Sequence, residues 1–507
     1  MKKKWIQIAA CLLIMCMLFS AAGCGGNFAE STTPTTLPAV EKAPQSGWVR
    51  GRVLLEDGAL SVAGIIVEDA KGNTWRTTTD VLSGYELELE AGEYKLTFTH
   101  GPEYATVTES VTVKGYAVKR LPDVILTQHT DLYAKGWIPG DLHMHTTYSD
   151  GADSVSQQLL SNISQGLYFG FLTDHNTIDG LTEWSQGNTV SAFTDADGQT
   201  RDFGAFNGNE ITTQFGHYQA LGVEIKFDDT WVSITAEDKN AQGEANDEAL
   251  KEKIIYIAQQ IRDAGGVPQI NHPYSTRDMG FHYWEIADYF DTIEIWNGVF
   301  VPGDGRYESE NPNDLEQNYR SKLKWYELLN EVKNGGKFHA ATGGTDNHNT
   351  ASPYTPYMEV DQITNMEEYN EVYRRNGKYS GVPTTYVYCP EEITQEAVLE
   401  ALVAGHSFIS NGVTVLADVN GASYGETAVI TEEMMLNMDI FSREGLESIA
   451  VIKNGEVMQE ITLEPGTQNY NQPVQLSGLQ TGDWIVLEVF GTQTRYAITN
   501  PIFFTGE

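Results

Sequence analysis

The stretch GDLHMHTTYSDG, residues 140–151, brings two histidines and an aspartate close together in the chain. One residue separates His143 from His145, so both imidazoles would lie on the same side of an extended strand. Two imidazoles arranged in this way can bind one metal ion together. Asp150 follows shortly afterwards and adds a carboxylate. The stretch therefore predicts the first part of a metal site rather than a polar surface loop.

Residues of the same chemical types recur further along the chain. GTDNH, residues 344–348, repeats the alternate spacing with an aspartate and a histidine, and TDHN, GNE, FGHY and NHP lie between the two stretches. Imidazoles and carboxylates without a thiolate suit Mn, Fe or Zn better than a cysteine-rich zinc site or an all-oxygen calcium site. Six of the 11 histidines belong to this set, which argues against chance. The candidate metal ligands are His143, His145, Asp150, His175, Glu210, His217, His272, Asp346 and His348.

Short apolar strands and amphipathic helices alternate in the part of the chain that carries these residues. Strands are expected in YFGFLTDH, VPQINHP and FHAATGGTDNH, each of which ends in candidate ligands. Helices with one apolar face are expected before Gly166, Gly265 and Gly335, because glycine commonly ends a helix. Functional residues at the carboxyl ends of parallel strands are typical of a β/α barrel.

A β-rich module is expected on each side of this region. In residues 47–128, apolar and polar residues alternate over 85–89 and again over 94–98, which predicts a β-hairpin. The segment resembles small β-sandwiches of the carboxypeptidase-regulatory or Ig-like kind. A second β-module is expected over 413–507, where Asn454 and Gly455 predict a tight hairpin turn.

The N-terminus predicts export and lipidation. Residues 1–23 have a basic start, an apolar run and small residues before Cys24, and AAGC resembles the bacterial lipobox. Cys24 would then carry lipid, and the Thr- and Pro-rich residues 24–46 would form a tether. An uncleaved membrane anchor is the alternative, and both place the body outside the cytoplasm. Cys389 would be the single cysteine outside residues 1–24, expected in the core rather than as a nucleophile.

The motifs GDLHMHTTYSDG, FLTDHNT, GNE, INHP and GTDNH together resemble those of the PHP (polymerase and histidinol phosphatase) superfamily. The ending ALVAGHSFISNG makes residues 136–412 most similar to its CehA/McbA-type metallohydrolases. The resemblance implies an α/β fold, a distorted seven-stranded PHP β/α barrel between two all-β modules, with two or three divalent ions. His143, His145, Glu210 and Asp346 would hold the first ion. Glu210, bridging, would hold the second with His217 and His272, and Asp150, His175 and His348 would hold a third.

The resemblance also implies a reaction, in which a metal-bridging hydroxide cleaves a phosphoester, or a carboxylic or carbamic ester, of a small extracytoplasmic substrate. Glu210, His175 and His272 are the expected catalytic residues. Arg277, Asn176 and His406 are the substrate candidates, while Asp174 and Asn176 are also expected to orient ligands.

Two other interpretations remain open. One is a phosphodiesterase that scavenges extracellular nucleotides or phospholipids, and the other is a binding lipoprotein for glycan or a phosphorylated ligand, with an inert barrel. A polymeric nucleic acid is not an expected partner, because the formal net charge of -38 repels phosphate backbones. The sequence makes no prediction of the oligomeric state.

Overall fold

The computed structural model describes residues 45–506, except 57, 196, 276–278, 299–301, 303–313, 351–379 and 494. The predicted signal segment, Cys24, nearly all of the tether and Arg277 therefore lie outside the described residues. Residues 44–507 form one compact unit. Among the helices of the described part, none is both long enough and apolar enough to cross a membrane.

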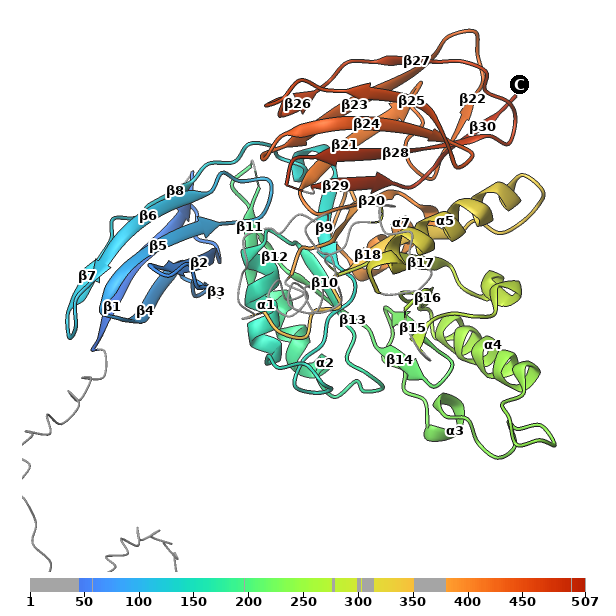
Figure 1. The fold of residues 1–507 in the computed structure, drawn as a ribbon, viewed down its shortest axis with the longest axis horizontal. Helices are drawn as coiled ribbons and strands as arrows, with labels where there is room; N and C mark the ends of the chain where they lie inside the picture. Colours follow the sequence, from blue (N-terminus) through green and yellow to red (C-terminus); the bar gives the residue numbers. More distant parts are fainter. Residues whose placement is uncertain are drawn as a thin grey trace, which may run out of the picture. The chain divides into compact units, whose positions relative to one another are not determined.

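The first part of the chain forms two four-stranded sheets in the orders β4-β1-β7, with β8 also on β1, and β3-β2-β5-β6 (Figure 1). A buried cluster that includes Val49, Leu96 and Phe98 draws on both sheets. The strands are β1 (Ser46–Leu55), β2 (Gly64–Asp69), β3 (Thr74–Thr78), β4 (Gly84–Glu90), β5 (Gly92–Thr99), β6 (Val107–Val113), β7 (Val118–Arg120) and β8 (Val124–Leu126).

The predicted hairpin between β4 and β5 is wrong, although both strands exist. Strand β4 pairs with β1, whereas β5 pairs with β2 and β6 in the other sheet. Ala91 is the single residue between the two strands, which is shorter than the two-residue loops of tight hairpins. The alternation correctly placed Leu87 and Phe98 in the core, but alternation does not specify which strands pair.

The central region has two main sheets, and β11 and β12 form a separate two-stranded one. In the first main sheet β10 pairs in parallel with β9 and with β13, and in the second β17 pairs in parallel with β16 and with β18. The predicted seven-stranded barrel is not confirmed, because the described strands do not form one continuous ladder. The strands are β9 (Trp137–Asp141), β10 (Phe169–Leu172), β11 (Ser191–Thr194), β12 (Thr200–Asp202), β13 (Gly204–Asn207), β14 (Glu210–Thr213), β15 (Gly216–Leu221), β16 (Val267–Ile270), β17 (Thr292–Asn297), β18 (Ala340–Gly344), β19 (Thr384–Tyr388) and β20 (Ser407–Ser410).

The three predicted helices are present and end as expected. Helix α1 begins with a capping box between Ser154 and Gln157, and glycines with positive φ follow α1, α4 and α5. The helices are α1 (Val155–Ser164), α2 (Leu181–Trp184), α3 (Asp229–Val232), α4 (Asp247–Asp263), α5 (Asp314–Val332) and α7 (Gln395–Ala404), with 3-10 turns η1 (Tyr133–Lys135), η2 (Ser185–Thr189) and η4 (Trp284–Tyr289).

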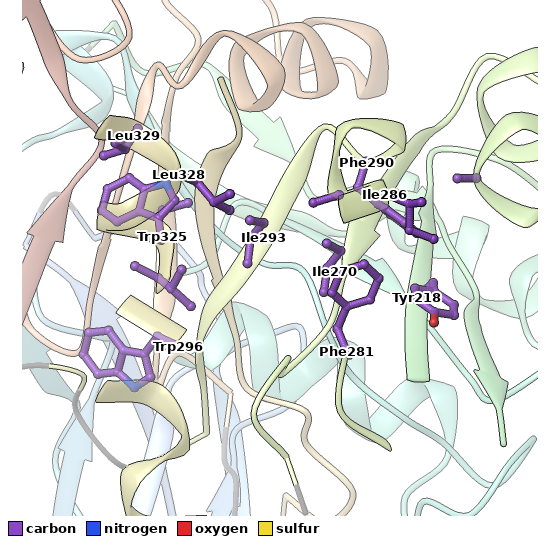
Figure 2. Packing of buried hydrophobic residues seen from close by; sticks show 14 of the residues in the cluster. Tyr218, Ile270, Phe281, Ile286, Phe290, Ile293, Trp296, Trp325, Leu328 and Leu329 are labelled. Atoms are coloured by element: carbon purple, nitrogen blue, oxygen red, sulfur yellow. The ribbon is translucent and has the colours of Figure 1, made fainter. Parts of the chain in front are cut away.

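Helices α4 and α5 cover the second central sheet through a large apolar cluster. Figure 2 shows Trp325 and Leu329 of α5 on one side of this cluster, with Ile293 of β17 between them and Ile270 of β16. The buried face of α4 contributes Ile254, Ile257 and Ile261. The apolar face of each helix thus packs against the second central sheet, whose strands lead into the ligand-bearing segments.

The last part of the chain extends the first central sheet. Strand β20 pairs with β29, so a single sheet continues from β13 to β25 and includes strands on both sides of residue 412, the predicted domain boundary. The predicted turn is confirmed, since Asn454 and Gly455 have positive φ between the paired β24 and β25. The strands are β21 (Val413–Val419), β22 (Thr427–Val429), β23 (Met434–Ser442), β24 (Leu446–Lys453), β25 (Glu456–Thr462), β26 (Asn469–Tyr470), β27 (Val474–Leu476), β28 (Trp484–Gly491), β29 (Tyr496–Thr499) and β30 (Ile502–Thr505).

Cys389 lies in the core, as the sequence predicts. It is a free, buried cysteine, and burial raises the pKa of its thiol. A thiol in that state is a poor nucleophile.

Glu103 is a buried carboxyl group outside the candidate metal site. Burial raises its pKa from 4.5 to about 8, although the N–H of Leu132 donates a hydrogen bond to its Oε2 at 3.0 Å. The folded protein therefore keeps a proton that the unfolded chain releases. Because the folded pKa is the higher one, this contribution to stability is lost as the pH rises through the range from 4.5 to about 8.

We expect Glu103→Gln to remove this pH dependence. The substituted amide is neutral at every pH, so the variant should gain stability relative to the wild type between about pH 5 and about pH 9. Thermal unfolding at both values measures the difference. Glu88→Gln, at an exposed position of β4, is the control and should follow the wild type. Parallel profiles for Glu103→Gln and the wild type would contradict the assignment.

Candidate metal centre

The candidate ligands lie where the two central sheets meet. The segment after β9 joins the segment after β18 through a parallel bridge between Met144 and Asn347. The segment after β10 joins the start of β14 through a parallel bridge between His175 and Glu210. Side chains from both sheets are brought together at these two junctions.

Glu210 is the centre of the arrangement. Its side chain is 1% exposed, and imidazole nitrogens approach both of its oxygens. The contacts of Oε2 are His175 Nδ1 at 2.9 Å, His143 Nε2 at 3.3 Å and His145 Nε2 at 3.4 Å, and those of Oε1 are His217 Nδ1 at 3.1 Å and His272 Nε2 at 3.2 Å.

Two aspartates complete the cluster, one buried and one exposed to solvent. Asp346 Oδ1 lies 3.1 Å from His145 Nε2 and 3.5 Å from His348 Nδ1. Asp150 Oδ1 lies 3.1 Å from His348 Nε2 and 3.5 Å from His175 Nε2. The side chain of Asp150 is 62% exposed, so this edge of the cluster is open to water, whereas the part around Glu210 is closed.

All nine candidate ligands belong to groups whose ligand atoms lie within 4.8 Å of one another. The groups are His143 with His145 and Glu210; His143 with His272 and Asp346; His175 with Glu210 and His217; and His145 with Asp150, His175 and His348. The last group contains the three residues expected for a third ion. His272 groups with His143 and Asp346 rather than with His217, so the division of ligands among separate ions stays a prediction.

Several polar atoms of the cluster have no hydrogen-bond partner. Among the described residues these buried atoms include His143 Nε2, both ring nitrogens of His145, Glu210 Oε2 and His272 Nδ1. Buried polar atoms are normally satisfied, since leaving one unpaired costs roughly 1–3 kcal/mol. Imidazole nitrogens and a carboxylate oxygen that converge without hydrogen bonds are suitable ligands for divalent metals. The residues therefore fit a metal centre.

The electrostatics of the cluster are dominated by Glu210. Burial opposes its ionisation, but the imidazoles of His143, His175 and His217 outweigh burial and lower the pKa of Glu210 well below its usual range. Burial likewise opposes protonation of His175, but Glu210 and Asp150 raise its pKa to about 8. Burial lowers the pKa of His145 well below its usual range, so this imidazole is neutral and ready to bind metal.

Glu294 of β17 is a residue of the candidate site that the sequence did not identify. Its Oε1 lies 3.0 Å from His143 Nδ1, and its Oε2 accepts hydrogen bonds from the N–H of His272 at 3.0 Å and from Asn297 Nδ2 at 3.1 Å. When His143 Nδ1 carries the proton of this contact, the opposite ring nitrogen is free for metal. The sequence signal that could have identified Glu294 is a charged residue inside the apolar strand TIEIWN, because a buried carboxylate requires partners.

Close packing around Glu294 explains a glycine of the GTDNH motif. A Cβ atom on Gly344 would lie 2.4 Å from Cβ of His143 and 2.7 Å from Oε1 of Glu294. Any side chain there would displace both residues.

Asp174 and Asn176 hold the loops that carry the ligands. Asp174 accepts hydrogen bonds from the backbone N–H and the hydroxyl of Thr146 at 2.7 and 2.6 Å and from the hydroxyl of Ser149 at 2.6 Å. Asn176 donates to the carbonyl of Thr212 at 2.8 Å and accepts from its N–H at 3.1 Å. Both polar atoms of Asn176 are therefore used within the protein, which supports orientation of ligands rather than substrate contact.

The backbone is strained at this site. Asn176, His272 and Asp346 have φ values of 51°, 24° and 49°, which L-residues rarely adopt. Such conformations persist only where surrounding contacts enforce them, and they gather at functional sites.

His406 does not reach the site. Its carbonyl accepts a hydrogen bond from the N–H of Tyr388, which is paired with Trp137, the first residue of β9. The candidate ligands follow the other end of β9, about 20 Å away at roughly 3.3 Å per residue. His406 therefore lies at the opposite end of the sheet from the metal centre. Arg277 lies outside the described residues.

Comparisons with known proteins give distant similarities. No family model matches the chain. The DNA polymerase/3'-5' exonuclease PolX of Bacillus subtilis is 33% identical over 112 residues, which are 20% of this chain and 19% of PolX. The chain thus matches about a fifth of the length of that relative.

Two solved structures are also similar to the chain, at lower sequence identity but over a larger share of its length. A two-domain protein from Bacteroides vulgatus containing a predicted PHP-like metal-dependent phosphoesterase is 12% identical, covering 72% of this chain and 95% of the other, with a TM-score of 0.35. An amidohydrolase from Chromobacterium violaceum is 17% identical over 41% of this chain and 87% of the other, with a TM-score of 0.25.

We expect Glu294→Gln to weaken metal binding by about 10- to 100-fold, the usual effect of removing a hydrogen-bond partner of a ligand. Glutamine has only one acceptor oxygen, so its amide nitrogen would face a donor in either orientation, at His143 or at His272 and Asn297, and the support of the ligands would be disturbed. Competition with a chromogenic chelator measures the affinity for Zn²⁺. Glu103→Gln, a buried carboxyl group elsewhere, should bind metal as the wild type does, and an unchanged affinity for Glu294→Gln would refute its role.

Proposed function

We propose that the protein is a metal-dependent hydrolase of the PHP superfamily, of the CehA/McbA type, that cleaves ester bonds of small molecules. The observation that carries the proposal is Glu210, a buried carboxylate contacted by five imidazoles, in a cluster with unpartnered nitrogen and oxygen atoms. The motifs that resemble the superfamily supply the residues of this cluster. Phosphoesters are the preferred substrates, and carboxylic or carbamic esters are the alternative.

Two or three divalent ions, Mn, Fe or Zn, would be held by the nine candidate ligands. Bound divalent ions supply a Lewis acid and activate water at neutral pH. Glu210 offers one oxygen to each of two sets of imidazoles, so it can be shared between neighbouring ions. Glu294 and Asp174 hold the ligand-bearing segments and keep the constellation rigid before substrate binds.

Exposure indicates the direction from which substrate arrives. The side chains of Asp150, His348 and His175 are 62%, 33% and 23% exposed, whereas those of His143 and His145 are 0% exposed. A substrate would therefore approach over the Asp150 edge and meet the buried part of the cluster last. Exclusion of water from that part strengthens its electrostatic interactions.

The metal claim is tested by the double variant His143→Ala with His145→Ala. Because it removes two nitrogen ligands, we expect its content of tightly bound metal, measured by elemental analysis after dialysis, to fall by at least half. His129→Ala, at an exposed histidine outside the motifs, should retain wild-type content. Unchanged metal in the double variant would refute the assignment.

The activity is tested with metal-loaded wild type and Glu210→Gln on p-nitrophenyl phosphate, bis-p-nitrophenyl phosphate and naphthyl acetate. We expect turnover of at least one phosphoester, lowered by more than about 100-fold in Glu210→Gln because the shared carboxylate is lost. A metal-loaded protein that hydrolyses none of the three would favour the binding lipoprotein instead.

We further propose that the protein is exported and anchored to a bacterial membrane through lipid on Cys24. The support is the signal-like segment with its AAGC ending. The thiol of Cys24 is the expected attachment point, so a fatty-acid analogue should label the wild type but not Cys24→Ala. Cys389→Ala is the matched control and should be labelled normally. Persistent labelling of Cys24→Ala would contradict the proposal.

A further inference from the structure

Arg320 is a basic residue that contacts the segment following the candidate ligand His272. It is on α5, and its guanidinium carbon lies 4.4 Å from the centre of the Tyr274 ring. Tyr274 follows His272 by two residues, after the carboxyl end of β16. The same helix contacts the surroundings of the centre, because the amide of Asn318 makes two hydrogen bonds to the backbone of Asn297. Arg320 is thus held near the ligand-bearing edge of the second central sheet.

Arg320 differs from the neighbouring basic residues of α5 in its ion pairing. Its neighbours on α5 have acidic partners, since Lys322 contacts Glu488 at 2.7 Å and Lys324 contacts Glu327 at 2.8 Å. Among the side chains that the structure describes, which on α5 begin at Gln317, no acidic group forms an ion pair with Arg320. Its side chain is half-buried. A guanidinium that these described side chains leave without an acidic partner can pair with an anion from outside the protein.

The geometry suits recognition of an anion. Stacking on an aromatic ring holds the plane of a guanidinium but leaves its N–H groups at the edges free to donate hydrogen bonds. A planar fork of this kind binds phosphate or carboxylate through two parallel hydrogen bonds. Tyr274 itself stacks on Trp284, with ring centres 5.9 Å apart and planes at 27°. This contact holds the ring against which Arg320 packs.

We propose that Arg320, positioned by Tyr274, is a specificity-determining residue that binds an oxyanion of the substrate, either a phosphate or a carboxylate group. The proposal rests on the proposed hydrolase function and adds the substrate class, an anionic ester. Metal ions alone would attract any ester oxygen, whereas an arginine beside them favours substrates that carry negative charge.

The test is calorimetric titration of the metal-loaded full-length protein with inorganic phosphate and, separately, with acetate, which distinguishes the two oxyanions. We expect Arg320→Ala to bind the preferred oxyanion about 10- to 100-fold more weakly, because it loses charged hydrogen bonds. Arg320→Lys should fall in between, since it keeps the charge but loses the fork. Lys324→Ala is the matched control: Lys324 lies one turn away, 5.3 Å from the Trp284 ring, and should bind as the wild type does.

Kinetics provide a second measurement. For p-nitrophenyl phosphate, Arg320→Ala should raise KM with little change in kcat, while the KM for neutral naphthyl acetate should stay unchanged. Tyr274→Phe keeps the ring and should retain oxyanion binding, whereas Tyr274→Ala should weaken it.

The outcomes separate this proposal from the hydrolase function. Equal oxyanion binding by Arg320→Ala and wild type, or no binding by the wild type, overturns the role of Arg320 even when metal content and hydrolysis are intact. Arg320-dependent binding in a protein that retains no metal and hydrolyses no ester overturns the hydrolase function and leaves the oxyanion site standing. Metal content is therefore measured for every variant.

Discussion

The contact between the Glu210 carboxylate and the surrounding imidazoles is the interaction on which the rest of the structure depends. Burial of one carboxylate would normally favour its neutral form, yet the nearby imidazoles lower the pKa of Glu210 well below its usual range. The side chains that surround it come from both central sheets, which meet at the bridges between Met144 and Asn347 and between His175 and Glu210. The same junctions that join the sheets therefore assemble the centre.

This arrangement costs stability, and the surrounding protein offsets the cost. Polar atoms without partners and positive φ values at three non-glycine residues would each destabilise an ordinary core. Glu294, Asp174 and Asn176 counteract them with hydrogen bonds to the ligand-bearing segments. Apolar packing of α4 and α5 then holds the second sheet beneath the site. A rigid centre of this kind favours metal binding because little reorganisation is needed when the ion arrives.

Much of the site could be predicted from the sequence, because chemistry-bearing residues followed recognisable strands. The alternate spacing of His143 and His145, and of Asp346 and His348, indicated the two junction segments correctly. Glu294 was missed since one carboxylate within an apolar strand has no local pattern, and its partner His143 is distant in the chain. The pairing of β4 and β5 was mispredicted because alternation defines faces, not neighbours. His406 was misplaced because the sequence does not show that β19 runs antiparallel to β9, which puts the start of β20, and His406 before it, at the end of the sheet away from the ligands.

The central proposal is that the Glu210 carboxylate would be shared between neighbouring divalent ions. Electron paramagnetic resonance of the protein loaded with Mn²⁺ tests it most directly, because ions joined by one carboxylate are magnetically coupled and isolated ions are not. The account predicts a coupled spectrum in the wild type that is lost in Glu210→Gln. A spectrum of isolated Mn²⁺ in the fully loaded wild type, unchanged by that substitution, would contradict it.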